Sequence, residues 1–123
     1  MRTAEIEING KKHLLCFNLW ALMEVTDRYG GLSEMYTALT EGTIRERANT
    51  ALWVLEVLMK GGKIYADEMS IDNPEPLTAE KMLGICGADF FVNLKANIMD
   101  AINNGMSTNV KVENPKNAET TQA

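Results

Sequence analysis

The chain has 123 residues, of which 46% are hydrophobic and 24% charged, so it is long enough for one globular domain and too apolar to be disordered throughout. Its formal net charge of −5 disfavours a nucleic-acid binder, because such proteins usually concentrate basic residues on one face. No apolar run approaches the about 20 residues that cross a bilayer, and no secretory signal is visible. Cys16 and Cys86 lack the spacing of metal ligands, and because no export signal is visible we expect them to be reduced thiols in a cytoplasmic protein. Because no apolar run could cross a bilayer, we also expect no membrane partner.

The first predicted element is a β-hairpin over residues 3–17. Glutamate and isoleucine alternate over residues 5–8, and Asn9-Gly10 favours a type I′ turn, which needs positive φ at both central positions. A two-residue turn sets Ile6 opposite His13 and makes an apolar face of Ile6, Ile8, Leu15 and Phe17. A lone hairpin is marginal in water, so this face must pack on helices or on another subunit.

Four or five helices are predicted to follow in one small α+β domain, mainly α, that spans residues 1–105. Asn18 is a suitable N-cap for a helix over about 18–29, and Gly30-Gly31 can supply the left-handed conformation that ends it. A shorter helix is expected over about 33–40.

The central helix is predicted over about 44–60. Thr43 and Glu46 have the spacing of a capping box, and apolar residues then cover more than half of the helix surface. A helix this apolar belongs in the core. We interpret Gly61-Gly62 as the point where it ends.

The rest of the domain is predicted as a loop and two helices. Residues 63–77 are acidic and contain two prolines, which exclude regular helix around them. A short helix over about 78–86 and a phenylalanine-rich helix over about 88–104 follow. Residues 106–123 are almost entirely polar, and we expect a disordered C-terminal tail there.

The sequence contains no catalytic constellation. His13 is the single histidine, and we interpret it as a half-exposed strand residue because no nucleophile or carboxylate can be placed beside it. We interpret Cys86, which lies between two glycines, as a buried small residue rather than a reactive thiol. The acidic residues over 67–75 do not match a calcium-binding loop. We therefore expect no enzymatic activity, no cofactor and no metal.

Contact with a partner is predicted for the apolar hairpin face and for methionines outside the core. Seven of the eight methionines are internal, and methionine suits surfaces that repack against varied partners. The predicted partner-binding residues are Ile6, Ile8, Leu15, Phe17, Met35 and Met69.

The order of these segments resembles the tail assembly chaperones of long-tailed bacteriophages, prophages and gene transfer agents. The resemblance covers roughly residues 4–105, and its most telling part is the hairpin around Ile8-Asn9-Gly10-Lys11 running into a helix that closes on Tyr29-Gly30-Gly31. It implies a non-enzymatic chaperone in the cytoplasm of the bacterial host that binds tape measure protein, helps to recruit tail tube protein and is absent from the finished tail. It defines no catalytic residues.

Physical considerations agree with the role that the resemblance implies. A small protein with an adaptable apolar groove can mask the exposed stripes of a long helical partner, and acidic charge keeps such a complex soluble. The free edge of the hairpin would offer backbone groups to a partner or to a neighbouring copy, which gives a route to self-association.

The alternative is a small helical DNA-binding or regulatory protein of a phage or prophage. Its reading helix would be the one over 44–60. The basic residues available there are Arg45, Arg47 and Lys60, with Glu46 and Glu56 interspersed, which is a poor basic face.

Overall fold

A two-stranded antiparallel hairpin leads into five helices in residues 2–106, the part of the chain that this computed structural model describes. The elements are β1 (Thr3–Ile8), β2 (Lys11–Cys16), α1 (Leu19–Tyr29), α2 (Leu32–Thr40), α3 (Ile44–Glu68), α4 (Ala79–Ile85) and α5 (Phe90–Gly105). The predicted mainly helical α+β class is therefore confirmed. Apart from Met106, the tail predicted over residues 106–123 lies outside the described residues.

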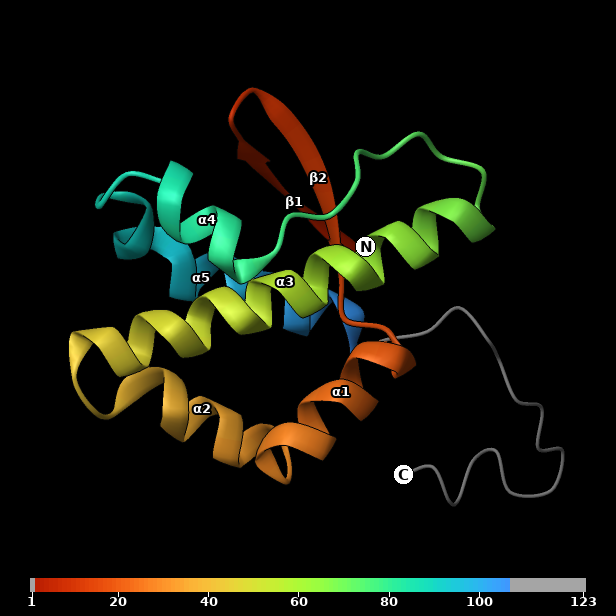
Figure 1. Cartoon of the computed structure of the whole chain (residues 1–123). Coiled ribbons are helices and arrows are strands. Elements are labelled where there is room, and N and C mark those ends of the chain that lie inside the picture. Colours follow the sequence, from red (N-terminus) through yellow and green to blue (C-terminus); the bar gives the residue numbers. More distant parts are fainter. Residues whose placement is uncertain (1, 107–123) are drawn as a thin grey trace, which may run out of the picture.

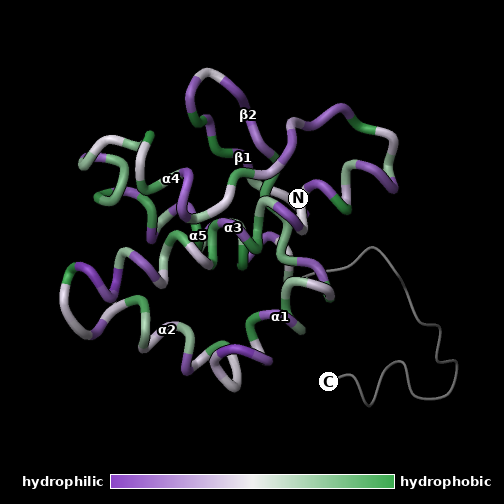
Figure 2. The backbone as a smooth tube through the Cα atoms, viewed as in Figure 1, coloured by the Kyte–Doolittle hydropathy of each residue, from purple (hydrophilic) through white to green (hydrophobic). Residues whose placement is uncertain are grey.

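The central helix α3 crosses the whole molecule and contacts β2 and each of the other helices (Figure 1). The hairpin and α4 lie on one side of it, and α1 and α2 lie on the other. Hydrophobic stretches of the chain converge where α3 and α5 meet (Figure 2). Leu55, Leu58 and Met59 of α3 are fully buried there, which confirms the prediction that this helix is central.

The hairpin has the predicted turn and register. Asn9 and Gly10 have φ angles of 54° and 80°, as a type I′ turn requires, and Ile6 lies opposite His13. The apolar face of the hairpin packs on α3 and α5 of the same chain and belongs to the hydrophobic core. The sequence indicated that this face must pack on helices or on another subunit, and the helices of the same chain cover it.

Two helix starts that the sequence predicts, those capped by Asn18 and by Thr43, are also confirmed. The Asn18 side chain accepts a hydrogen bond from the Ala21 N–H at 3.0 Å. The Thr43 hydroxyl accepts from the Glu46 N–H at 3.1 Å, while the Glu46 carboxylate accepts from the Thr43 N–H at 2.9 Å, which completes the capping box. Each bond satisfies a backbone donor that has no partner inside its helix.

The end of α1 is held against α3 by aromatic contacts. The rings of Tyr29 and Trp53 meet edge to face, with their centroids 5.5 Å apart. The guanidinium of Arg28 lies 4.6 Å from the Trp53 ring centroid, within the range of a cation–π interaction. Gly30 then adopts a φ of 98° and ends the helix, as the sequence predicts.

The predicted end of the central helix at Gly61-Gly62 is wrong, because α3 continues through both glycines to Glu68. A Cβ atom on Gly61 would meet the Cys16 carbonyl oxygen, and one on Gly62 would meet the Leu14 carbonyl group. The glycines therefore allow the backbone of α3 to press directly on β2. Residues 63–68, predicted as loop, form the last turns of this helix as a result.

We predict that Gly62→Ala destabilises the protein and that Gly84→Ala does not. Alanine favours a helix by about 1 kcal/mol over glycine, but overpacking typically costs about 1–3 kcal/mol, and at Gly62 the obstacle is strand backbone that cannot move aside. Gly84 lies in α4 with nothing near its missing side chain, so alanine there should add about 0.4–1 kcal/mol. Urea unfolding of both variants measures the difference. Equal stability changes would mean that the contact between α3 and β2 is not tight.

Candidate functional site

Five of the six residues predicted to bind a partner lie inside the protein. Ile6, Ile8, Leu15, Phe17 and Met35 are all buried in the core, with Met35 and Leu15 fully so. Met69 alone is exposed, at the end of α3. The hairpin face therefore stabilises the fold and is covered in the folded chain, and a contact surface must be sought among other side chains.

A mainly apolar depression lies between α3, α4 and the start of α5. Its volume is about 180 Å³. Met82 and Leu94 close its floor, since both are fully buried. We call it the apolar cleft; its lining includes Ala48, Leu52, Met82, Leu83, Phe91 and Leu94.

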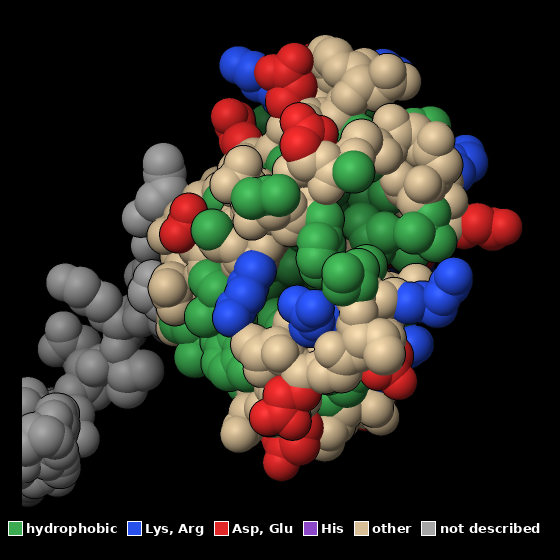
Figure 3. Space-filling model, turned by 90° about the vertical axis from the view of Figure 1, so that its left-hand side faces the viewer, with side chains coloured by type: hydrophobic (Ala, Val, Ile, Leu, Met, Phe, Trp, Pro, Cys, Tyr) green, Lys and Arg blue, Asp and Glu red, His purple; other side chains and the backbone are tan. Residues whose placement is uncertain are grey.

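The apolar surface continues past Phe91 into a second depression of about 320 Å³ between α2, α3 and α5. Val92 lines this depression and is 76% exposed, and Arg47 and Lys95 lie beside it. Figure 3 shows the same face of the molecule: hydrophobic side chains gather around a hollow, with Lys and Arg side chains next to it. An apolar surface with a cationic margin is thus exposed to solvent.

The wall of the apolar cleft that α4 provides is fixed to α3 by one carboxylate. Glu56 accepts a hydrogen bond from the Ala79 N–H at 2.8 Å and forms an ion pair with Lys60 at 2.9 Å. Burial alone would raise the pKa of Glu56, but the bonds from Lys60 and from the Ala79 N–H hold it below its ordinary value. Thr78 caps the same helix by accepting from the Lys81 N–H at 3.1 Å.

The size of the apolar cleft fits side chains better than a free ligand. Small-molecule sites usually enclose about 300–1,000 Å³ and bury most of the ligand. Leu83 lines the apolar cleft and is 56% exposed, so the apolar surface of the cleft continues onto the outside of the protein. Such a surface can take up the apolar side chains of another protein, as grooves that bind amphipathic helices do. Sequence reasoning did not identify Leu83, Phe91 or Val92, because helical spacing does not tell which apolar positions stay uncovered.

His13 is buried, and the prediction of a half-exposed histidine is wrong. His13 lies on the inward face of β2, opposite Ile6. Pro74 and Leu77, in the loop between α3 and α4, line the same depression as His13. Neither ring nitrogen has a hydrogen-bond partner among residues 2–106. Burial lowers the pKa of His13, and the nearby charge of Lys11 lowers it further, so the ring is neutral at pH 7.

The two thiols are poor nucleophiles. Burial raises the pKa of Cys16, although the charge of Arg2 opposes the shift, and burial also raises the pKa of the half-buried Cys86. A raised pKa keeps a thiol protonated, which disfavours a reactive Cys86, but this residue is half-buried and not buried as the sequence predicts.

The described residues offer neither a metal-binding cluster nor a helix that could cross a membrane. Within residues 2–106, no three His, Cys, Asp or Glu side chains come together in a way that would hold a metal ion. The helices of that part are also each too short or too polar to span a bilayer.

The helix that the DNA-binding alternative requires is the core of the fold. α3 is covered by β2 and by the other four described helices. Of its basic residues, Arg47 donates to the Gly42 carbonyl at 3.2 Å and Lys60 is paired with Glu56. A helix that reads DNA must present a free basic face to a groove, and α3 is poorly placed to do so.

Comparison of the chain with protein-family models, with curated proteins and with solved structures finds no match. Among the surfaces of the described residues, the apolar cleft and its cationic margin are the best candidate site.

We predict that His13 makes the folded state less stable as the pH falls below about 6.5, the ordinary pKa of histidine. Its pKa is lower in the folded than in the unfolded chain, so the unfolded chain binds the proton first, and stability falls by at most about 1.4 kcal/mol per pH unit. Protonation of the Glu56 carboxylate lowers the stability of the folded state only below about pH 4.5. Urea unfolding between pH 7 and 5 measures the His13 effect.

The His13→Leu variant is the control, because the chain has no other histidine. Leucine has a similar volume and removes two buried nitrogens that lack partners in the described structure, so the variant should fold and keep nearly constant stability over this pH range. The same slope in both proteins would contradict the burial of His13.

Proposed function

We propose that this protein is a non-enzymatic tail assembly chaperone of a phage or prophage, acting in the cytoplasm of the bacterial host. It binds tape measure protein, helps to bring tail tube protein to it and is absent from the finished tail. The proposal rests on the resemblance in segment order and on one structural observation. That observation is the apolar cleft, lined by exposed Leu83, together with the adjoining depression, lined by exposed Val92; both lie on the surface of a fold whose core is buried without a partner.

The apolar cleft supports binding of an amphipathic helix. A tape measure protein is long and helical, and before assembly its apolar stripes are exposed to water. A helix of that kind would place apolar side chains at a spacing of three and four residues into the cleft and the adjoining depression. Leu83 and Val92 would lie against it, and Phe91, which lines both depressions, would lie between them.

The charges around the cleft favour a stripe flanked by acidic residues. Arg47 and Lys95 lie at the margin, where they would face the polar border of the bound helix. Such contacts at the margin of an interface set orientation and association rate more than affinity. The net charge of −5 over the whole chain keeps several chaperone copies apart on one partner and the complex in solution.

We predict that Leu83→Glu combined with Val92→Glu abolishes the ability to keep tape measure protein soluble. Both side chains are exposed, at 56% and 76%, so the fold should tolerate the change while the apolar contact is lost. The control is Leu19→Glu combined with Met23→Glu on α1, where the side chains are 72% and 57% exposed and lie away from the cleft. Co-expression with tape measure protein, followed by measurement of its soluble fraction, compares the two.

The wild-type chain and the α1 variant should keep the tape measure protein in solution, and the cleft variant should not. Thermal melting of each purified variant shows whether it is folded. The proposal is wrong if the tape measure protein precipitates equally with and without the wild-type chain. If both double variants work, the apolar cleft is not the contact surface.

A further inference from the structure

The outer edges of the two strands are identified by the hairpin register. Ile8 and Lys11 flank the two-residue turn and form a hydrogen-bonded pair, and such pairs alternate with non-hydrogen-bonded ones along an antiparallel ladder. Thr3, Glu5 and Glu7 on β1 therefore direct their N–H and C=O groups away from β2. Two side-chain contacts agree with this assignment: Asn104 donates to the Thr3 carbonyl at 2.9 Å, and on β2 the Leu14 N–H donates to Asn73 at 2.9 Å.

The edges differ in how far they are covered. The outer edge of β2 faces Gly61, Gly62 and Asn73. Within residues 2–106, the outer edge of β1 receives a hydrogen bond at Thr3 only. The outward N–H and C=O groups of Glu5 and Glu7 have no hydrogen-bond partner anywhere in residues 2–106. We call this stretch the open edge.

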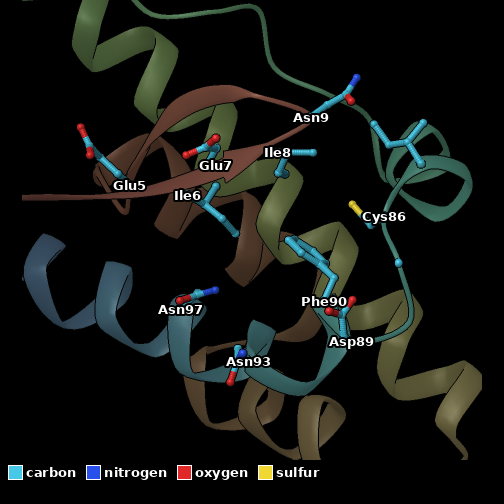
Figure 4. A pocket seen from close by; sticks show the side chains of 12 residues that line it. Glu5, Ile6, Glu7, Ile8, Asn9, Cys86, Asp89, Phe90, Asn93 and Asn97 are labelled. Carbon is cyan, nitrogen blue, oxygen red and sulfur yellow. The ribbon is translucent and has the colours of Figure 1, made fainter.

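The open edge borders a groove of about 490 Å³, which we call the edge groove (Figure 4). β1 forms one side of it, α5 the other, and the segment that joins α4 to α5 closes one end. Ile6 and Phe90 point into the space between the strand and the helix, and Asn93 and Asn97 lie along α5. The groove thus combines free backbone groups with an apolar floor and amide side chains.

The charge along the open edge is negative. Glu5 and Glu7 are exposed and point away from the space that Ile6 and Phe90 enter, exposed Asp89 lies at the start of α5, and the lining includes no Lys or Arg among the described residues (Figure 4). None of these three carboxylates takes part in an ion pair within residues 2–106, although Lys12 lies opposite Glu7 on β2. The groove therefore attracts a cationic partner.

The same charges oppose pairing between two copies of the protein. If the β1 edges of two copies joined, Glu5 and Glu7 of one copy would lie against those of the other. Like charges directly opposite on neighbouring strands are destabilising, whereas opposite charges stabilise the pair. The occupant that fits is a different protein segment with basic residues.

We propose that the edge groove binds an extended, basic segment of a partner protein, which adds to β1 as an antiparallel third strand. Its backbone hydrogen-bonds with Glu5 and Glu7, and its Lys or Arg side chains, at alternate positions, lie on the same face as these glutamates. The intervening side chains face Asn93, Asn97 and Phe90. This inference does not depend on the proposed function, because Glu5 and Glu7, which carry it, do not line the apolar cleft, although Phe90 lines both surfaces.

The probe for this proposal is a short peptide in which lysine and valine alternate, added to the full-length chain labelled with ¹⁵N. The amide protons of Glu5 and Glu7 should exchange rapidly in the free protein and at least about tenfold more slowly in the complex. Glu5→Lys combined with Glu7→Lys should weaken binding at least about tenfold, measured by titration. The matched control is Glu41→Lys combined with Glu68→Lys, an equal charge change at exposed sites outside the groove, which should change the affinity less than about threefold.

Backbone pairing is tested separately from charge with two methylated peptides. In an antiparallel third strand, the lysine N–H groups face β1 and the valine N–H groups face solvent. Methylation of the lysine backbone nitrogens should abolish binding, and methylation of the valine nitrogens should preserve it.

Four results would each overturn the proposal. They are no binding of the unmodified peptide, no effect of the charge reversal at Glu5 and Glu7, equal binding of both methylated peptides, or slow exchange of the Glu5 and Glu7 amides before any peptide is added. The last result would mean that the chain itself or a second copy already occupies the open edge. None of them bears on the apolar cleft, so the two proposals fail independently.

Discussion

The contact between Gly61-Gly62 of α3 and the outer edge of β2 determines how the other elements are placed. With no side chains between them, helix and strand meet backbone to backbone, which brings the apolar face of the hairpin against the core. Asn18 strengthens this junction, because its amide donates to the Gly61 carbonyl at 3.2 Å while its oxygen caps α1. The hairpin is therefore an internal support for α3, and the surfaces that remain exposed are those of the helices and of β1.

Signals confined to a few neighbouring residues could be read from the sequence. The Asn9-Gly10 turn fixed the strand register, and the cap at Asn18 and the capping box at Thr43 fixed two helix starts. The glycine pair at Gly61-Gly62 could not be assigned, because a helix end and a close helix–strand approach have the same local sequence. The choice depends on which distant segment packs there. His13 was misplaced although its own register put it on the inward face, since the loop that covers it is known only from the fold.

The candidate site was the part least accessible to sequence reasoning. Apolar residues at helical spacing were correctly expected to form a core. The sequence does not show which of these residues remain exposed because no other element packs on them. Leu83 follows the fully buried Met82 about 100° further around α4, where no other element covers it within residues 2–106, and Val92 is left exposed in the same way on α5. The result is two neighbouring surfaces of opposite character. The apolar cleft, whose adjoining depression has a cationic margin, meets the groove with the acidic edge at Phe90, which lines both the cleft and the groove.

The bond between Asn104 and Thr3 joins the last described helix to the first strand, across 101 positions of sequence. Gly105 packs in the same region against Phe17, where a side chain would meet the Phe17 carbonyl. During synthesis the hairpin and α1 to α4 leave the ribosome before α5 does, so one side of the hairpin stays uncovered until the end of α5 has emerged. The nascent chain thus has no complete core until almost all of the described residues have been translated, and it must remain soluble in that open form in the meantime.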